Sequence, residues 1–182
     1  MALMHSDFDR VLINREQIRV CIAKLAARLD ADYKEKDPLF VCILKGSVFF
    51  FTDLLKALTI PAEIDFMSVS SYGNGDTTSG YVKMIKDLDR PITGRHVIIV
   101  EDLIDTGTTL SHLCELLRTR DPASLSICTL MDKPERRIAD VKVDYCGVEI
   151  PDEFVVGYGL DYAERYRNLP EVYILSRKVY EK

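Results

Sequence analysis

Two short, strongly apolar runs limit what this chain can fold into. LFVCIL occupies residues 39–44 and HVIIV occupies 96–100, and neither run alternates with polar residues as a half-exposed strand does. Apolar runs of this length predict strands that are buried on both faces, which occur in the centre of parallel sheets covered by helices. The two runs therefore predict central strands of an α/β sheet.

Helical and strand segments alternate around these runs. Asn14 and Gln17 match a capping box and are followed by apolar residues at helical spacing, which predicts a helix from about Arg15 to Asp30. Further helices are predicted over 48–58 and 108–120, and further strands over 62–71, 82–89 and 124–132. The alternation predicts a mostly parallel sheet flanked by helices, with ligands at the carboxyl ends of the strands.

The last third of the chain has a different pattern. Three short β-like pieces, 143–150, 154–159 and 171–176, are separated by glycine and proline, and no long helix is indicated. With 182 residues, the chain is expected to form a single domain, residues 1–182. We expect this domain to carry a small flap or hood from the chain ends, mainly from 141–182.

One polar segment has almost nothing to bury. SYGNGDTTSGY, residues 71–81, concentrates glycine, asparagine, aspartate, serine and threonine. Such a composition predicts a mobile surface loop over about 70–82, or a loosely held hairpin.

Charge and composition exclude several kinds of protein. The formal net charge of −5 and the pI near 5.3 argue against a nucleic-acid partner, which usually requires a basic face. No apolar run approaches the roughly 20 residues that span a bilayer, so we expect no membrane partner and a cytoplasmic location. The five cysteines form no C-x-x-C pair and the three histidines lack metal-ligand spacing, which predicts buried free thiols and no zinc site.

The segment VIIVEDLIDTGTTL, residues 97–110, places three acids within five residues, directly after an apolar run. Glu101 and Asp102 are expected just beyond the strand end at Val100. The turn 105–109 then leads into a predicted helix, whose N-terminal N–H groups and threonine hydroxyls favour a phosphate. As an alternative, Asp105 or Thr106 caps the helix, and Glu101 and Asp102 are solvated loop charges. The cluster of acids at a strand end weakens that alternative.

The acids and the turn suit different parts of one ligand. Neither the P-loop pattern nor the dinucleotide-binding glycine pattern is present. Carboxylates accept hydrogen bonds from a ribose diol and hold Mg²⁺, which the phosphates of the same ligand can share. The segment therefore predicts a site for a phosphorylated sugar.

The same segment resembles the phosphoribosyl pyrophosphate (PRPP) motif of the type I phosphoribosyltransferases. Further segments are similar to those of the hypoxanthine-guanine phosphoribosyltransferases of bacterial type, in the same order: LKGS at 44–47, SSYGNGDTTSG at 70–80, TLMDKPERR at 129–137, IPDEFVVGYGLDY at 150–162 and RYRNLP at 165–170. The resemblance implies the type I phosphoribosyltransferase fold. It also implies Mg²⁺-dependent transfer of 5-phosphoribosyl from PRPP to N9 of hypoxanthine or guanine, and a homodimer or homotetramer.

The resemblance assigns roles to the residues around PRPP. Glu101 and Asp102 would bind the ribose hydroxyls, directly or through Mg²⁺, and Asp105 would be the general base that takes a proton from purine N7. The 5-phosphate cradle would consist of Thr106, Gly107, Thr108 and Thr109. Pyrophosphate would be bound by Lys45, Gly46 and Arg167, with an uncommon cis peptide before the glycine, while Ser71 and Tyr72 would begin the lid. Arg137 would assist or merely pair with an acid.

The resemblance also assigns a purine site. Lys133 would donate to the purine 6-oxygen and Phe154 would stack on the purine, although by themselves a surface lysine and a core phenylalanine are the simpler interpretations. The backbone of Val155 and the side chain of Asp161 would contact the base edge and a second Mg²⁺. The segment differs from some relatives at Glu153, and the preference between hypoxanthine and guanine stays open.

Two alternatives remain at this stage. A phosphoribosyltransferase fold can be reused as an RNA-binding regulator of nucleotide genes, which would require a basic face and could dispense with Asp105. A second enzyme on the same scaffold would prefer xanthine. The acidic balance and the presence of Asp105 and Lys133 disfavour the first alternative, and the sequence does not exclude the second.

Overall fold

The computed structural model describes residues 6–71 and 82–181. Most of the predicted lid, including Tyr72, lies outside the described residues, and for Ser71 the structure describes only the backbone, at the end of a strand. In the described ranges, no helix is both long enough and apolar enough to cross a membrane.

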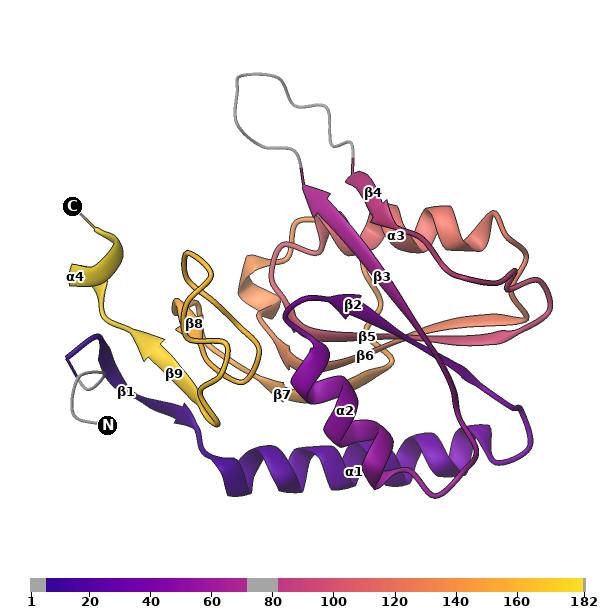
Figure 1. Cartoon of the computed structure of the whole chain (residues 1–182), viewed down its shortest axis with the longest axis horizontal. Helices are drawn as coiled ribbons and strands as arrows, with labels where there is room; N and C mark the ends of the chain where they lie inside the picture. The colour runs from indigo at the N-terminus through magenta and orange to yellow at the C-terminus, as the bar shows by residue number, and fades with distance from the viewer. Residues whose placement is uncertain (1–5, 72–81, 182) are drawn as a thin grey trace.

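The centre of the molecule is a six-stranded sheet with helices on both faces (Figure 1). Its strand order is β4-β3-β2-β5-β6-β7, and β3 and β4 are antiparallel while the other neighbours are parallel. The strands are β2 (Leu39–Leu44), β3 (Glu63–Ser71), β4 (Val82–Lys86), β5 (His96–Ile104), β6 (Ser124–Asp132) and β7 (Tyr145–Glu149). The predicted mostly parallel α/β sheet is confirmed.

Both faces of the central strands are covered. Alternate side chains of β2 and β5 enter two separate apolar cores. Phe40 and Ile98 belong to the core that includes residues of α1 (Arg15–Tyr33) and α2 (Val48–Ala57), whereas Val41 and Ile99 belong to the core that includes residues of α3 (Thr108–Arg118). Strands in this position need no polar side chains on either face, which explains the two apolar runs in the sequence.

Helix α1 begins as predicted and ends later than predicted. The Asn14 side chain accepts a hydrogen bond from the Gln17 N–H, and the Gln17 side chain accepts one from the Asn14 N–H, each at 2.9 Å. The helix continues past Asp30 to Tyr33, which is 5% exposed and donates a hydrogen bond to Ser126 at 2.9 Å. This contact with β6 gives the last turn a partner that the local sequence does not show.

A second, three-stranded antiparallel sheet forms the hood, in the order β1-β9-β8. Its strands are β1 (Phe8–Ile13), β8 (Val155–Val156) and β9 (Val172–Leu175), and a short helix, α4 (Arg177–Tyr180), follows β9. The expected hood from the chain ends is confirmed. The segment 141–182 is shared between the two sheets, because β7 joins the large sheet, and the N-terminal strand β1 was not predicted.

The topology creates a crevice between two central strands. From β2 the chain proceeds to β3 on one side, and from β5 it proceeds to β6 on the other side. Side chains and loops at the carboxyl ends of β2 and β5 therefore diverge, and ligands bind at such points in open α/β sheets. The pairing of β2 with β5 ends at Cys42 and Val100, whereas β5 continues beside β6 as far as Ile104.

The continuation of β5 corrects one expectation. The strand was expected to end at Val100, with the acids beyond it, but Glu101 and Asp102 belong to the strand itself. Their backbone positions are set by pairing with β6, where Glu101 lies opposite Thr129. The apolar run alone ended too early because Glu101 and Asp102, which interrupt it, line a cleft, although the strand continues to Ile104 in the core.

All five cysteines are free thiols, as expected, but Cys21 and Cys146 are only partly buried, so the prediction that all five are buried is wrong for these two. Cys42, Cys114 and Cys128 are buried, and burial raises the pKa of Cys42 to about 12 and that of Cys114 to about 11.

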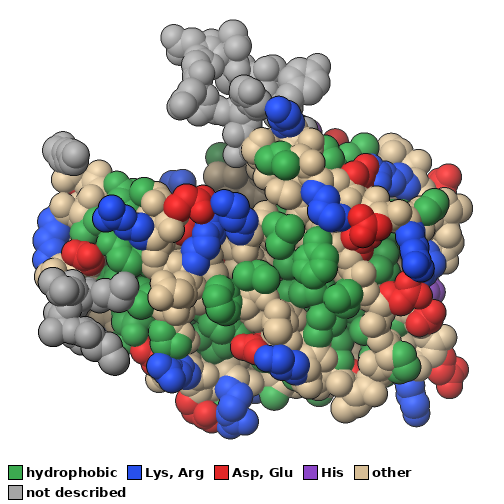
Figure 2. All heavy atoms as spheres, in the orientation of Figure 1, with side chains coloured by type: hydrophobic (Ala, Val, Ile, Leu, Met, Phe, Trp, Pro, Cys, Tyr) green, Lys and Arg blue, Asp and Glu red, His purple; other side chains and the backbone are tan. Residues whose placement is uncertain are grey.

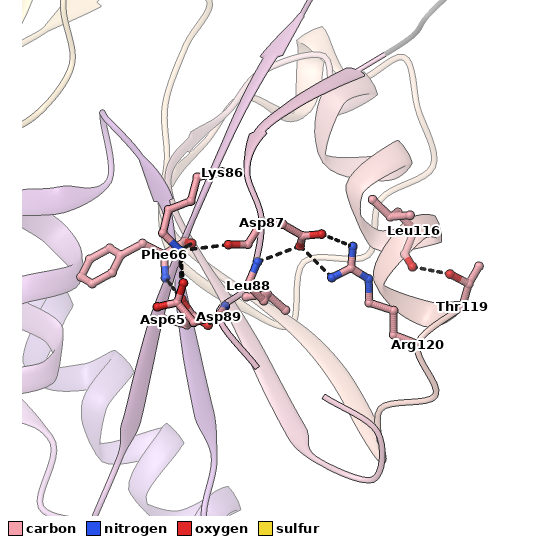
Figure 3. Close-up of polar contacts among 9 residues, drawn as sticks. All are labelled: Asp65, Phe66, Lys86, Asp87, Leu88, Asp89, Leu116, Thr119 and Arg120. Atoms are coloured by element: carbon pink, nitrogen blue, oxygen red, sulfur yellow. Dashed lines mark hydrogen bonds and ion pairs between the residues drawn. The ribbon is translucent and has the colours of Figure 1, made fainter. Parts of the chain in front are cut away.

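A polar network holds β4 against its neighbours (Figure 3). Asp65 of β3 is 7% exposed and accepts hydrogen bonds from the backbone N–H groups of Phe66 at 2.7 Å and Asp89 at 2.8 Å. Lys86 of β4 lies 3.4 Å from the same carboxylate. Arg120, after α3, donates twice to Asp87, at 2.7 and 2.8 Å. The network connects the start of β3, the end of β4 and the end of α3.

Replacing Asp65 should therefore destabilise the fold. In Asp65→Ala, the partly buried N–H groups of Phe66 and Asp89 lose their acceptor and Lys86 loses one of its carboxylate partners, so we expect a loss of about 1–3 kcal/mol in the free energy of unfolding. Urea denaturation measures it. Asp9→Ala, at an exposed acid of β1, is the control and should change the stability little. Equal stability of the two variants would contradict this account of the network.

Candidate functional site

A cleft of about 300 Å³ lies at the carboxyl end of β5, in the crevice that the topology predicts. Its walls are the loop after β2, the end of β5 and the first turn of α3. Seven of the residues predicted for the site line this cleft: Gly46, Glu101, Asp102, Asp105, Thr106, Gly107 and Thr109. Thr108 is the first residue of α3 and does not line it.

Two adjacent carboxylates form the floor of the site. Ser47 donates a hydrogen bond to Glu101 Oε2 at 2.7 Å and accepts one from the Asp102 N–H at 3.1 Å. Burial raises the pKa of Glu101 well above its ordinary value, and the neighbouring Asp102 raises it further. Burial also raises the pKa of Asp102 to about 6. A desolvated acid pair of this kind favours a ligand that supplies positive charge or hydroxyl donors.

The loop after β2 packs directly on the acid pair. The cis peptide expected directly before Gly46 lies one bond earlier, between Leu44 and Lys45. A Cβ atom at Gly46 would overlap with the Asp102 carboxylate, so that no larger residue fits without moving the acid. Glycine at this position lets the backbone approach the carboxylate.

The turn before α3 has a geometry that suits an anion. Gly107 has φ 78°, in the left-handed region, and a Cβ there would meet the Arg137 side chain at 3.0 Å. The Thr106 carbonyl accepts hydrogen bonds from the N–H groups of Ile138 and Ala139, at 2.9 and 3.1 Å, which anchors the turn. Helix α3 starts at Thr108, beside the cleft. The N–H groups of its first turn point out of the N-terminal end of the helix and have no partner within the helix.

Asp105 has an internal partner in this structure. Its Oδ1 lies 3.1 Å from Nε of Arg136, which also lies 3.6 Å from Asp152. Asp105 must exchange this arginine for a ligand if it is to act as a base.

Lys133 is buried, which excludes the surface-lysine alternative. Its N–H donates to the Ile104 carbonyl at 2.9 Å, and this bond places it beside the end of β5. Its side chain is 7% exposed, and Nζ donates to the Glu153 carbonyl at 2.8 Å. Nζ also lies 4.0 Å from Asp152 Oδ1. An ammonium that donates one hydrogen bond within the described residues retains donors for a ligand.

Phe154 is 39% exposed and is not a core residue. It stacks on Tyr180 of α4, with 5.0 Å between ring centroids and 28° between planes, and contacts the edge of Tyr162 at 5.7 Å. Val155, the next residue, is buried in β8. The hood therefore presents a partly open aromatic ring.

The two cations predicted for pyrophosphate share one acid. Glu164 Oε2 lies 3.0 Å from Lys45 Nζ, and its Oε1 lies 3.3 Å from the Arg167 guanidinium. Arg167 also pairs with Asp161 at 2.7 Å and donates to the Gly159 carbonyl at 2.9 Å. Contact with Lys45, followed by contact with Arg167, lowers the pKa of Glu164. This loop of the hood thus closes over the loop after β2.

Two buried arginine nitrogens have no hydrogen-bond partner within the described part of the chain, Nε of Arg137 and Nε of Arg167. Arg137 pairs with Asp132 and donates to the Val141 carbonyl at 3.4 Å. Of the two roles expected for Arg137, pairing with an acid is therefore observed. Unpaired arginine donors near the cleft are suited to an oxyanion.

The carboxylates fit Mg²⁺ as partial ligands. Across residues 6–71 and 82–181, no three His, Cys, Asp or Glu side chains are grouped so that they could hold a metal ion. Mg²⁺ is commonly bound by one or two carboxylates together with substrate phosphates, and Glu101 and Asp102 provide such a pair. Asp161 is engaged by Arg167 and by the Glu164 N–H at 2.9 Å.

Three residues of the site were missed by sequence reasoning. Ser47 was noted only as part of LKGS, because a serine before a helix is usually a cap. Arg136 and Glu164 contact site residues that are 31 and 119 positions away. No local pattern signals such contacts.

Comparisons with known proteins agree with the geometry. A family model described as phosphoribosyl transferase domain matches residues 10–163. The chain is 51% identical over 179 residues to the hypoxanthine-guanine phosphoribosyltransferase of Bacillus subtilis strain 168, with 98% of this chain and 99% of that protein covered.

Solved structures are also similar. A hypoxanthine phosphoribosyltransferase from Staphylococcus aureus has a TM-score of 0.95 and 49% identity, with 100% of this chain and 98% of that chain covered. A hypoxanthine phosphoribosyl transferase from Trypanosoma cruzi, in a structure concerned with its C-terminal region, oligomeric state and activity, has a TM-score of 0.91 and 41% identity, with 96% and 94% covered.

Removing the shared acid should free Lys45 and leave Arg167 with Asp161 as its only carboxylate partner in the described residues. In Glu164→Gln both cations keep their charges, so inorganic pyrophosphate should bind roughly two- to fivefold more tightly at low salt. The factor is small because these ion pairs are solvent-exposed. Calorimetry measures it, with Glu115→Gln on α3 as a control for the change in net charge. Weaker binding by Glu164→Gln would contradict the competition between Glu164 and the anion.

Proposed function

The chain belongs to the hypoxanthine-guanine phosphoribosyltransferases of the phosphoribosyl transferase domain family, and we propose that it catalyses the purine salvage reaction of that family. The 5-phosphoribosyl group of PRPP is transferred to N9 of hypoxanthine or guanine. The products are IMP or GMP and pyrophosphate.

One observation carries this proposal. The buried acid pair, Glu101 and Asp102, lines the same cleft as Thr106, Gly107 and Thr109 at the start of α3. The acid pair suits the ribose hydroxyls and the helix N-terminus suits the 5-phosphate, so the cleft can bind both ends of a ribose phosphate.

The residues of this cleft can support glycosyl transfer. The bond between C1′ and the pyrophosphate oxygen breaks and a bond from C1′ to purine N9 forms, through an oxocarbenium-like state. Glu101 and Asp102 favour the positive charge that develops on the sugar. The proton released from purine N7 goes to Asp105, once this carboxylate has left Arg136.

We propose Mg²⁺ as the cofactor, with Glu101 and Asp102 as its protein ligands and Asp161 at a second ion. Bound with PRPP, it would neutralise charge on the leaving pyrophosphate. The desolvation of the acid pair supports this assignment, because a nearby cation offsets the cost of burying two carboxylates.

We assign the purine to the space between Lys133 and the hood. The Lys133 ammonium donates to the 6-oxygen, which disfavours adenine because an amino group there would present a donor to a donor. Phe154 stacks on the ring and the Val155 backbone contacts the base edge. The partial exposure of Phe154 and the burial of Lys133 support these roles.

We assign pyrophosphate to Lys45, Gly46 and Arg167. The side chains of Lys45 and Arg167 are cations, and each is now paired with a carboxylate that a polyphosphate can replace. Ser71 and Tyr72 remain our proposal for the start of a lid that excludes water from the activated sugar.

We further propose a homodimer or homotetramer in the cytoplasm. Figure 2 shows hydrophobic side chains gathered over the region of β3, where Ile64 is 50% exposed. Phe49 of α2 is 42% exposed, whereas Phe50 and Phe51 belong to the core and cannot form an interface. The five free thiols suit a reducing compartment. Sedimentation velocity measures the state of association.

The decisive experiment supplies PRPP and Mg²⁺ with hypoxanthine, guanine, xanthine or adenine in separate assays. We expect IMP from hypoxanthine and GMP from guanine, with release of pyrophosphate. No product with any 6-oxo purine would refute the enzymatic function. Xanthine as the best substrate would favour the xanthine enzyme, and adenine as the best would refute the role of Lys133.

The role of Asp105 has its own test. Asp105→Asn keeps the size of the side chain and removes the base, so kcat should fall by about 10²- to 10⁴-fold. PRPP binding, measured by calorimetry, should change little. Asp121→Asn is the control, because Asp121 is exposed in the turn before β6, at the opposite end of that strand. A wild-type kcat in Asp105→Asn would remove Asp105 from the mechanism.

A further inference from the structure

The side chain of Ser47 does not cap the helix that it precedes. Ser47 stands at the N-cap of α2, where serine normally accepts a hydrogen bond from the first turn of the helix. No such bond is present, although the residue is 0% exposed. Its Oγ is instead directed at the acid pair of β5.

This hydroxyl joins two separate segments of the site. It donates to Glu101 Oε2 at 2.7 Å and accepts from the Asp102 N–H at 3.1 Å. Both of its roles, as donor and as acceptor, are filled by consecutive residues of one strand. Since Lys45 and Gly46 immediately precede Ser47, the hydroxyl connects the loop assigned to pyrophosphate with the acids assigned to the sugar.

Close packing alone does not produce this connection. Gly46 already lies against the Asp102 carboxylate, so the loop approaches the strand at a neighbouring residue. Ser47 also fixes the orientation of the Glu101 carboxylate. Glutamate has two side-chain methylenes, so its carboxylate has several orientations unless a hydrogen-bond donor selects one. The 2.7 Å hydrogen bond from Ser47 selects one orientation, and the hydrogen bond from the Asp102 N–H, at 3.1 Å, holds the hydroxyl that donates it.

We propose that Ser47 is a positioning residue for the acid pair, whose hydroxyl orients the Glu101 carboxylate toward the cleft. This orientation couples the sugar end of PRPP to the loop that holds its pyrophosphate. The inference rests on the proposed function in one respect, the placement of PRPP in this cleft.

Variants of Ser47 separate this role from a structural one. Ser47→Ala removes the hydroxyl without adding volume, and Ser47→Cys keeps a weak donor of similar shape. Ser176→Ala is the matched control, because Ser176 is also buried and also stands at a helix N-cap without a capping bond. Thermal unfolding of each variant measures its stability.

The readouts are Mg·PRPP binding by calorimetry, the KM for PRPP and the KM for hypoxanthine. In Ser47→Ala we expect Mg·PRPP to bind roughly 10-fold more weakly, as for the loss of a hydrogen bond to a charged group. The KM for PRPP should rise by a similar factor and that for hypoxanthine by less than about twofold. Ser47→Cys should recover part of the loss, and Ser176→Ala should match the wild type.

Three outcomes would overturn the proposal. They are wild-type Mg·PRPP binding in Ser47→Ala, an equal rise of both KM values, and a loss explained by a lower melting temperature alone. The wild-type assay decides the proposed function separately. If the wild type binds Mg·PRPP but does not turn over, the proposed function fails while the binding ratio still tests Ser47; if it does not bind Mg·PRPP at all, both fail.

Discussion

The burial of two adjacent carboxylates at the end of β5 is the constraint on which the rest of the site depends. Desolvation raises the pKa of Glu101 and of Asp102, so the ionised pair is costly without a compensating partner. The protein tolerates the pair through the Ser47 hydroxyl and backbone donors. These contacts do not fully compensate the negative charge of the pair. The remaining charge attracts a cation and sugar hydroxyls.

The cations around the cleft are also internally paired. Lys45 contacts Glu164, Arg167 contacts Asp161, and Arg136 contacts Asp105. When a polyphosphate and a purine bind, they therefore replace carboxylates that already pair with these cations. Such an exchange can disfavour weaker anions, because a ligand must offer more than the carboxylate that it displaces.

The fold was largely predictable because local pattern and burial agree. LFVCIL and the run before Glu101 are apolar since both faces of β2 and β5 are covered, and the capping box before α1 is a local signal. Two elements were not predictable. Strand β1 is short and mixes charged with apolar residues. The part of β5 after Val100 begins with two acids, Glu101 and Asp102, because they line the cleft.

The sequence by itself determined the α/β architecture, the cluster of acids before a threonine turn, and the family. Only the tertiary structure decided which side chains contact one another: the burial of Lys133, the partial exposure of Phe154, the turn of Ser47 toward Glu101 and the contact of Glu164 with Lys45. The physical reason is range. Hydrophobic periodicity and capping act over a few residues and are visible in the chain, whereas desolvation and ion pairing depend on atoms that folding brings together from distant positions.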